Sequence, residues 1–234
     1  MSFKFKQFFV DDSNCPMKVG TDAVMLGAWA DLTGVTSVLD VGTGCGILAL
    51  MAAQRSDAQI TAIDVHAGAI RQAELNFANS PWYERLNAEA SDFNHHMERA
   101  GINYDYIISN PPFFINSLKT PSFSRNLARH SDDSLPVELL IAGASRLLQQ
   151  AGRFGIVFPA LQAHSFISKA SENGLILKRR IDVKPFPHSE ANRVLLEFSF
   201  SSQPVESNEL VIREHPGLYT LEYRNLTTDF YLNF

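Results

Sequence analysis

Strand-like and helix-like segments alternate through most of this chain, and this alternation limits the possible folds more than any other feature. Helical periodicity marks residues 47–56, 67–80, 136–152 and 161–174. Apolar strand-like segments lie at 36–42, 58–65, 85–93, 104–110, 153–159, 175–186 and 193–202. The order predicts an α/β fold with a seven-stranded, mostly parallel sheet. Because no helix separates the last two strands, we expect them to form an antiparallel hairpin at one edge of the sheet.

Length, charge and cysteine content narrow the class of protein. The chain has 234 residues and a formal net charge of −5, which suits one domain, 36–234, preceded by an N-terminal extension, 1–35. Its two cysteines, Cys15 and Cys45, form no disulfide framework, and its apolar runs are too short for a signal peptide or a membrane span. We therefore expect a cytoplasmic monomer that contacts no membrane. The acidic total disfavours a protein that coats nucleic acid, but it leaves room for an enzyme with one basic face.

A glycine-rich turn follows the first strand of the alternating region. Asp40 precedes Gly42, Gly44 and Gly46, and such a turn lets a ligand approach the backbone closely. The dinucleotide-binding fingerprint G-x-G-x-x-G/A fails, because Ile47 occupies its last position. An ordinary tight turn between strand and helix is the alternative.

The pattern D-x-G-x-G-x-G resembles the first motif of class I methyltransferases that depend on S-adenosylmethionine and have a Rossmann-like fold. The resemblance implies that the glycines make room for the amino-acid part of the cofactor, with Asp40 near its ammonium group. Asp64 ends the second strand and can accept hydrogen bonds from both ribose hydroxyls, although it could instead cap the following helix. In the same family pattern Asp92 accepts from the adenine amino group and Phe93 packs nearby; a plain turn aspartate is the alternative.

The fourth strand ends abruptly in Asn110, Pro111, Pro112 and Phe113. This N-P-P-F sequence resembles the motif of methyltransferases that act on planar, conjugated nitrogens. The lone pair of such a nitrogen is delocalised, so acceptors outside the amino plane can draw its hydrogens into a tetrahedral arrangement. The Asn110 side-chain oxygen and the Pro111 carbonyl can be these acceptors, held rigid by the prolines. Phe113 offers a face for base stacking, typically worth ~1–3 kcal/mol.

The two terminal segments narrow the choice of substrate. F-x-F-K-Q-F, M-K-V-G-T-D, L-G-A-W-A and the tail Y-R-N-L-T-T-D-F-Y-L-N-F resemble the tRNA adenine-N6 methyltransferases that modify adenine 37 of a valine tRNA. The resemblance covers nearly the whole chain and implies that Lys18, Gly20, Thr21 and Asp22 line the methionine end of the cofactor. Thr21 or Asp22 could also cap a helix. Enzymes that methylate guanine-N2 in rRNA, adenine in DNA or a protein glutamine are the alternative readings.

A tRNA substrate requires positive charge on the protein. We expect it from the loop after the catalytic turn and from the sixth strand, with the RNA-binding residues Lys119, Arg125, Arg129, His130, Arg179 and Arg180. The acidic segment with Glu206 and Glu209 is expected on the far face. His95 and His96 lack further ligands at metal-binding spacing, so we expect them on the surface and predict no metal site.

Overall fold

An eight-stranded sheet forms the centre of the computed structural model, which describes residues 2–99, 101, 103–112 and 135–234. The strand order is β10-β8-β9-β7-β6-β3-β4-β5. The strands are β3 Ser37–Val41, β4 Gln59–Asp64, β5 Leu86–Ala90, β6 Tyr104–Ser109, β7 Leu148–Pro159, β8 Ile176–Lys184, β9 Arg193–Ser199 and β10 Glu206–Val211. Neighbours pair in parallel except β9, which is antiparallel to both β7 and β8. The expected α/β fold with a mostly parallel sheet is confirmed.

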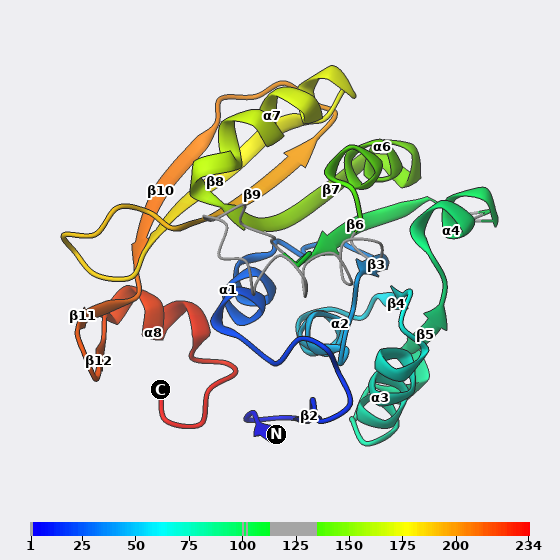
Figure 1. Cartoon of the computed structure of the whole chain (residues 1–234), viewed down its shortest axis with the longest axis horizontal. Coiled ribbons are helices and arrows are strands. Elements are labelled where there is room, and N and C mark those ends of the chain that lie inside the picture. The colour runs from blue at the N-terminus through cyan, green and yellow to red at the C-terminus, as the bar shows by residue number, and fades with distance from the viewer. Residues whose placement is uncertain (1, 100, 102, 113–134) are drawn as a thin grey trace, which may run out of the picture.

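Helices cover both faces of the sheet (Figure 1). One face carries α1 Thr21–Trp29, α2 Ile47–Arg55, α3 Ala67–Ala78 and α8 Leu221–Thr227, and the other carries α4 Phe93–Arg99, α6 Val137–Leu147 and α7 Ala163–Glu172. Alternate strand residues point to opposite faces, so Val38 and Leu39 belong to two different buried clusters. Burial on both faces explains why these strands are continuously apolar in sequence.

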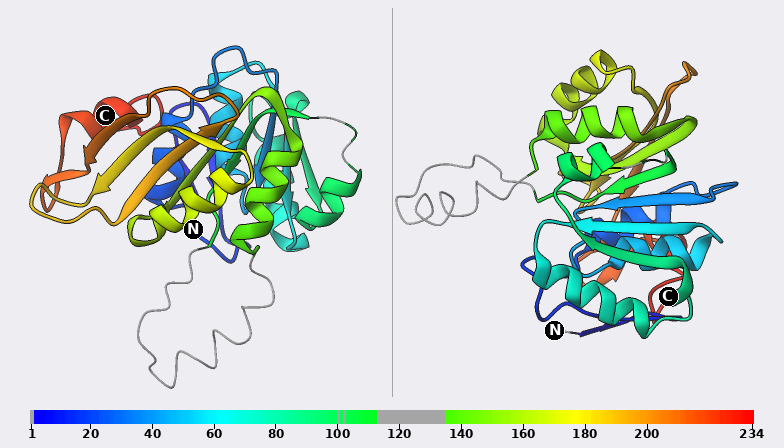
Figure 2. Two further views of the ribbon diagram at one scale, coloured as in Figure 1. Left: turned by 90° about the horizontal axis from the view of Figure 1, so that it is seen from above. Right: turned by 90° about the vertical axis from the view of Figure 1, so that its right-hand side faces the viewer.

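The two chain ends lie side by side under the first helical layer (Figures 1 and 2). The short strands β1 Ser2–Lys4 and β2 Phe9–Asp11 form a hairpin, and β11 Arg213–His215 pairs with β12 Leu218–Tyr219. The Lys6 ammonium donates to the carbonyls of Thr228 and Phe234, at 2.6 and 2.9 Å. This contact fastens the tail to the N-terminal segment. Among the described residues no helix has the length and apolarity that a bilayer span requires.

Three local expectations were wrong. The sheet has an eighth strand, because the acidic segment β10 pairs with β8, so the β8–β9 hairpin is not the edge. Ion pairs of Glu206 with Arg179 and Glu209 with Lys184 hold this edge strand in place. The helix expected to reach Gly152 ends at Leu147, because the next residues pair with β6 instead. The third difference is α4, an unexpected helix directly after β5.

The described residues also include two 3₁₀ turns, η1 Tyr83–Arg85 and η3 Ala160–Gln162.

Candidate active site

The carboxyl ends of β3, β4, β5 and β6 meet at one edge of the sheet, because these strands are parallel neighbours. The last residue of β3, Val41, lies opposite the last residue of β6, Ser109. The Ser109 hydroxyl donates to the Val41 carbonyl at 2.8 Å. The glycine turn after β3 and Asn110 after β6 therefore leave the sheet next to each other.

The glycine turn requires the backbone freedom of its three glycines. Gly42, Gly44 and Gly46 have φ angles of 72°, 56° and 83°, in the left-handed region that side chains disfavour. A Cβ built on Gly42 or Gly44 would have none of the described atoms within 4 Å, whereas one on Gly46 would lie 2.4 Å from the Phe77 ring. The first two glycines therefore leave space for a ligand, and the third allows α2 to pack closely against α3.

Asp40 is fully buried under this turn. Its Oδ2 accepts hydrogen bonds from the Thr43 hydroxyl at 2.6 Å and the Ala49 amide at 3.1 Å. Oδ1 has no hydrogen-bond partner among the described residues. Burial raises the pKa of Asp40 to about 7, the nearby charge of Asp64 adds to the rise, and the two hydrogen bonds oppose it. A cationic ligand group beside Oδ1 would stabilise the carboxylate.

Asp64 ends β4 and holds the glycine turn. Its Oδ2 accepts from the Gly44 amide at 2.9 Å, and its Oδ1 accepts from the His66 amide, also at 2.9 Å. The alternative role as a cap of α3 is not observed, because that helix begins after His66 without a side-chain cap among the described residues. Asp64 thus joins the two strand ends that the sequence predicted to hold the cofactor.

Asp92 and Phe93 both have structural partners. Asp92 is exposed and accepts from the His95 amide at 2.9 Å, which caps α4. Phe93 is 3% exposed, and a Cβ on Gly143 of α6 would lie 2.2 Å from its ring. Its ring therefore packs between α4 and α6. Asp92 is thus a helix cap and not a plain turn aspartate, and it lies at the same sheet edge as Asp64.

His96 is buried, contrary to the expectation of a surface position. Its Nε2 lies 3.1 Å from the Tyr104 hydroxyl, and burial lowers its pKa. His95 is exposed as expected. Among the described residues no three histidine, cysteine or acidic side chains are grouped for a metal ion.

Asn110 stands at the end of β6 with its side-chain oxygen unsatisfied. Oδ1 is buried and has no hydrogen-bond partner among the described residues. Buried acceptors are almost always paired, so an unpaired one at a strand end indicates a missing donor. Pro111 is buried and Pro112 is exposed, whereas Phe113 lies outside the described residues.

The segment before α1 bends back toward the same edge. The Lys18 ammonium donates to the carbonyls of Asp12 at 2.6 Å and Ser13 at 3.2 Å. Gly20 is the N-cap of α1 and Thr21 its first residue, so neither Thr21 nor Asp22 caps the helix. Asp22 accepts instead from the Arg193 guanidinium at 2.8 Å.

Thr43 and Arg193 were not anticipated at the site. Thr43 lies within the glycine motif, where a hydroxyl three residues after a buried aspartate was an available signal. Arg193 begins β9 and meets Asp22 across 171 positions, so no local pattern could indicate that pair.

The expected RNA-binding residues divide into two groups. Lys119, Arg125, Arg129 and His130 lie outside the described residues. Arg179 forms ion pairs with the buried Glu197 at 3.3 Å and with Glu206 at 3.9 Å, and it stacks 4.4 Å from the Trp29 ring centroid.

Arg180 makes two hydrogen bonds to Asp182, at 2.9 and 2.6 Å. Both arginines lie near the middle of β8, and three strand pairings separate them from β6, because Arg180 pairs with Leu196 of β9, Leu196 with Ile156 of β7, and Ile156 with Ser109.

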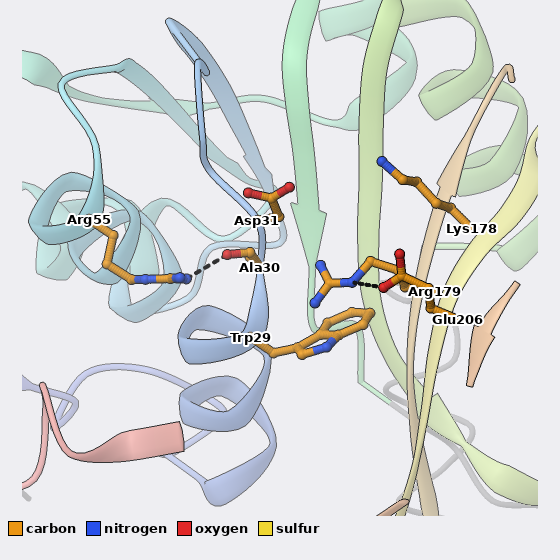
Figure 3. A pocket seen from close by; sticks show the side chains of 7 residues that line it. All are labelled: Trp29, Ala30, Asp31, Arg55, Lys178, Arg179 and Glu206. Carbon is orange, nitrogen blue, oxygen red and sulfur yellow. Dashed lines mark hydrogen bonds and ion pairs between the residues drawn. The ribbon is translucent and has the colours of Figure 1, made fainter. Parts of the chain in front are cut away.

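A pocket of about 400 Å³ lies beside Arg179 (Figure 3). It is lined by Trp29, Ala30, Asp31, Arg55, Lys178, Arg179 and Glu206. The Arg55 guanidinium donates to the Ala30 carbonyl at 2.6 Å at the end of α1 (Figure 3). Trp29 and Arg55 end α1 and α2, and Glu206 begins β10. The pocket is therefore separate from the glycine turn, which lies at the other end of α2.

Comparison with known proteins identifies the family. Residues 20–179 match the model of the methyltransferase small domain. A tRNA1(Val) (adenine(37)-N6)-methyltransferase of Phocaeicola vulgatus is 44% identical over 99% of this chain and 97% of its own length. The protein of the same name from Trichodesmium erythraeum is 40% identical over 99% and 98%.

Solved structures agree on the fold. A protein described as a predicted O-methyltransferase from Agrobacterium tumefaciens superposes with a TM-score of 0.68, at 17% identity, over 89% of this chain and 96% of its own. A geranyl diphosphate C-methyltransferase from Streptomyces coelicolor, solved with S-adenosyl-L-homocysteine, has a TM-score of 0.51 at 12% identity, over 71% of each chain. The Rossmann-like class I methyltransferase fold expected from the sequence is confirmed. By its full-length relatives and its domain model, the chain belongs to the tRNA1(Val) (adenine(37)-N6)-methyltransferase family.

Proposed function

We propose that this protein transfers a methyl group from S-adenosylmethionine to the N6 nitrogen of adenine 37 in tRNA1(Val). One observation carries the proposal: the unpaired Asn110 oxygen emerges beside the glycine turn, in a chain whose relatives bear that name. We propose that the enzyme acts in the cytoplasm, where its proposed tRNA substrate is expected, and that it acts as a monomer.

The chain's own residues fit the cofactor. Open space beside Gly42 and Gly44 suits its amino-acid part, and the orphan oxygen of Asp40 suits its ammonium group. Asp64 is proposed to bind the ribose, which requires its oxygens to accept hydroxyl donors besides the two amides. Lys18, Thr21, Gly46, Asp92, Phe93 and Asn110 complete the proposed binding set, and the extension 1–35 is proposed to cover it.

Asn110 and Pro111 are proposed to bind the adenine amino group through the side-chain oxygen and the backbone carbonyl, respectively. Bound S-adenosylmethionine supplies an electrophilic methyl group on its sulfonium. Drawing both amino hydrogens out of the ring plane restores the nitrogen lone pair for attack on that methyl group. The new N–C bond forms as the C–S bond breaks, which leaves S-adenosylhomocysteine as the product, and one amino proton leaves to water. Pro111 and Pro112 fix the backbone, so the acceptors need little reorganisation. Phe113 is proposed to stack on the base.

The loop after this turn is proposed to bind the RNA backbone through Lys119, Arg125, Arg129 and His130. Residues 116–130 contain no acidic side chain, which supports this assignment. Arg179 and Arg180 can contribute only if their ion pairs within the chain open.

Nucleoside mass analysis tests the proposal. The purified protein is incubated with S-adenosylmethionine and one of four substrates: tRNA1(Val), the same tRNA with guanine at position 37, rRNA, or DNA. We expect N6-methyladenosine in the first tRNA and none in the other three. Methylation of the guanine-37 tRNA, or of rRNA or DNA in preference to tRNA, would overturn the assignment.

A further inference from the structure

A buried asparagine on α3 joins two segments that are far apart in the sequence. Asn76 is 3% exposed. Its Oδ1 accepts from the Asp11 amide at 3.0 Å, and its Nδ2 donates to the Asp11 carbonyl at 2.9 Å and the Cys45 carbonyl at 2.8 Å. Cys45 stands between Gly44 and Gly46 in the glycine turn. One side chain therefore connects the end of β2 to the cradle of the candidate active site.

Neighbouring contacts hold the rest of the N-terminal strap, which we define as residues 11–19. The Asn14 side chain donates to the Gln72 side chain of α3 at 3.0 Å. Within the strap, the Asp12 carboxylate accepts from the Val19 amide at 3.0 Å. The Lys18 ammonium closes the same turn on the Asp12 carbonyl. The strap is thus a closed turn seated on α3. Asn76 links it to the glycine turn, and the Cys15 side chain also contacts Cys45 there.

The chemistry of the link requires an amide. The carbonyl oxygens of Asp11 and Cys45 need donors, and the backbone N–H of Asp11 needs an acceptor. The side-chain amide of asparagine supplies both a donor and an acceptor. An aspartate carboxylate could not donate to the two carbonyl oxygens and would repel them. An alanine would remove the partner of three backbone groups, and the Cys45 carbonyl among them is buried, where an unpaired group costs more than the hydrogen bond itself contributes.

We propose that Asn76 is a positioning residue that couples the strap to the glycine turn, so that cofactor affinity depends on the strap being seated. The Cys45 carbonyl fixes the orientation of the peptide groups around Gly44, where the cofactor is proposed to bind. This inference rests on the proposed cofactor and is independent of the RNA substrate.

Calorimetric titration with S-adenosylhomocysteine, without RNA, tests the coupling. We expect Asn76→Ala and Asn76→Asp to raise Kd roughly 10-fold or more. The matched control is Asn79→Ala at the C-cap of the same helix, because the Asn79 side chain donates only to the Leu75 carbonyl of α3, at 2.7 Å, among the described contacts. Its Kd is expected to stay within about twofold of the parent value. Folded Asn76 variants with the parent Kd would overturn the proposal.

Hydrogen exchange separates positioning from general stability. In Asn76→Ala we expect faster exchange confined to residues 11–19 and 42–46, partly reversed by S-adenosylhomocysteine. Uniformly faster exchange over the whole sheet would show a structural role and overturn the proposal. If the Asn76 variants fail to fold, Asn14→Ala loosens the strap at its exposed side, and a Kd unchanged in that variant would count against the coupling. If the parent protein does not bind S-adenosylhomocysteine, the proposed cofactor itself is wrong, a result that the methylation assay would also show.

Discussion

The Ser109 hydroxyl donates a hydrogen bond to the Val41 carbonyl at 2.8 Å, linking the last residues of β6 and β3. Both groups are buried, so the bond is shielded from competing water. It fixes where the chain leaves each strand. The Asn110 turn and the glycine turn are thereby held in one geometry, which the proposed reaction requires.

Replacement of Asn110 by alanine tests the proposed catalytic contact. We expect turnover to fall ~10²–10³-fold, the range seen when one hydrogen-bond partner of a transition state is removed. Cofactor affinity should change much less than turnover, because the other residues of the proposed binding set remain and Pro111 and Pro112 set the turn backbone. Single-turnover methylation and S-adenosylhomocysteine titration check the two quantities, and an equal loss in both would make Asn110 a structural residue.

The buried carboxyl of Asp40 predicts a pH-dependent stability. Its pKa is about 7 in the folded chain against 3.8 ordinarily, so the folded state retains a proton that the unfolded chain releases. The free energy of unfolding should therefore fall as pH rises from 3.8 through about 7, by at most about 4 kcal/mol. Urea denaturation of the cofactor-free protein across this range measures the effect. Asp40→Asn should flatten the dependence, whereas the exposed control Asp57→Asn should keep it.

Two glycine substitutions should differ in their effect on stability. Gly44→Ala adds only backbone strain at φ 56°, about 1–2 kcal/mol. Gly46→Ala adds strain at φ 83° and also places a methyl group 2.4 Å from the Phe77 ring, which raises the loss to about 3 kcal/mol. Urea denaturation gives both values. A larger loss for Gly44→Ala would contradict the assignment of Gly46 to helix packing.

Arg179→Ala should lower the free energy of unfolding and have little effect on the affinity for tRNA. It leaves the fully buried Glu197 carboxylate without its ion pair, which we expect to cost about 3 kcal/mol. Arg180→Ala breaks a partly exposed pair with Asp182 and should cost at most about 1 kcal/mol. Chemical denaturation and RNA titration are compared for the two variants. A stable Arg179→Ala protein that no longer binds tRNA would instead place Arg179 on the RNA surface.

A double charge reversal tests the proposed RNA-binding loop. Arg125→Glu combined with Arg129→Glu should weaken tRNA binding and lower the slope of log affinity against log salt by about 2, one for each lost phosphate contact. The charge-matched control reverses Arg99 and Arg146, which end α4 and α6 at the opposite edge of the sheet. If both double variants show the parent salt slope, the loop is not part of the RNA surface.

Short or charged elements escaped prediction because their sequence signals are local and weak. Residues 148–152 continue the helical pattern of α6, yet they form a strand because Leu148 pairs with Tyr104 of β6. Residues of β10 have no apolar alternation, and the strand forms because its backbone and its two glutamates find partners on β8. Tertiary pairing outweighs local preference in both cases.

Local periodicity and residue types at fixed spacing were enough to predict most of the alternating strands and helices, the glycine turn after Asp40, the diproline turn after Asn110 and the family. The pairing of buried polar groups, in contrast, became visible only in the folded chain. Asn76 joins Asp11 to Cys45, Arg193 joins Asp22, and Glu197 joins Arg179 and Tyr106. A buried polar group needs a hydrogen-bond partner, and packing often supplies one from a distant part of the sequence. Local spacing in the sequence does not show which residue that is.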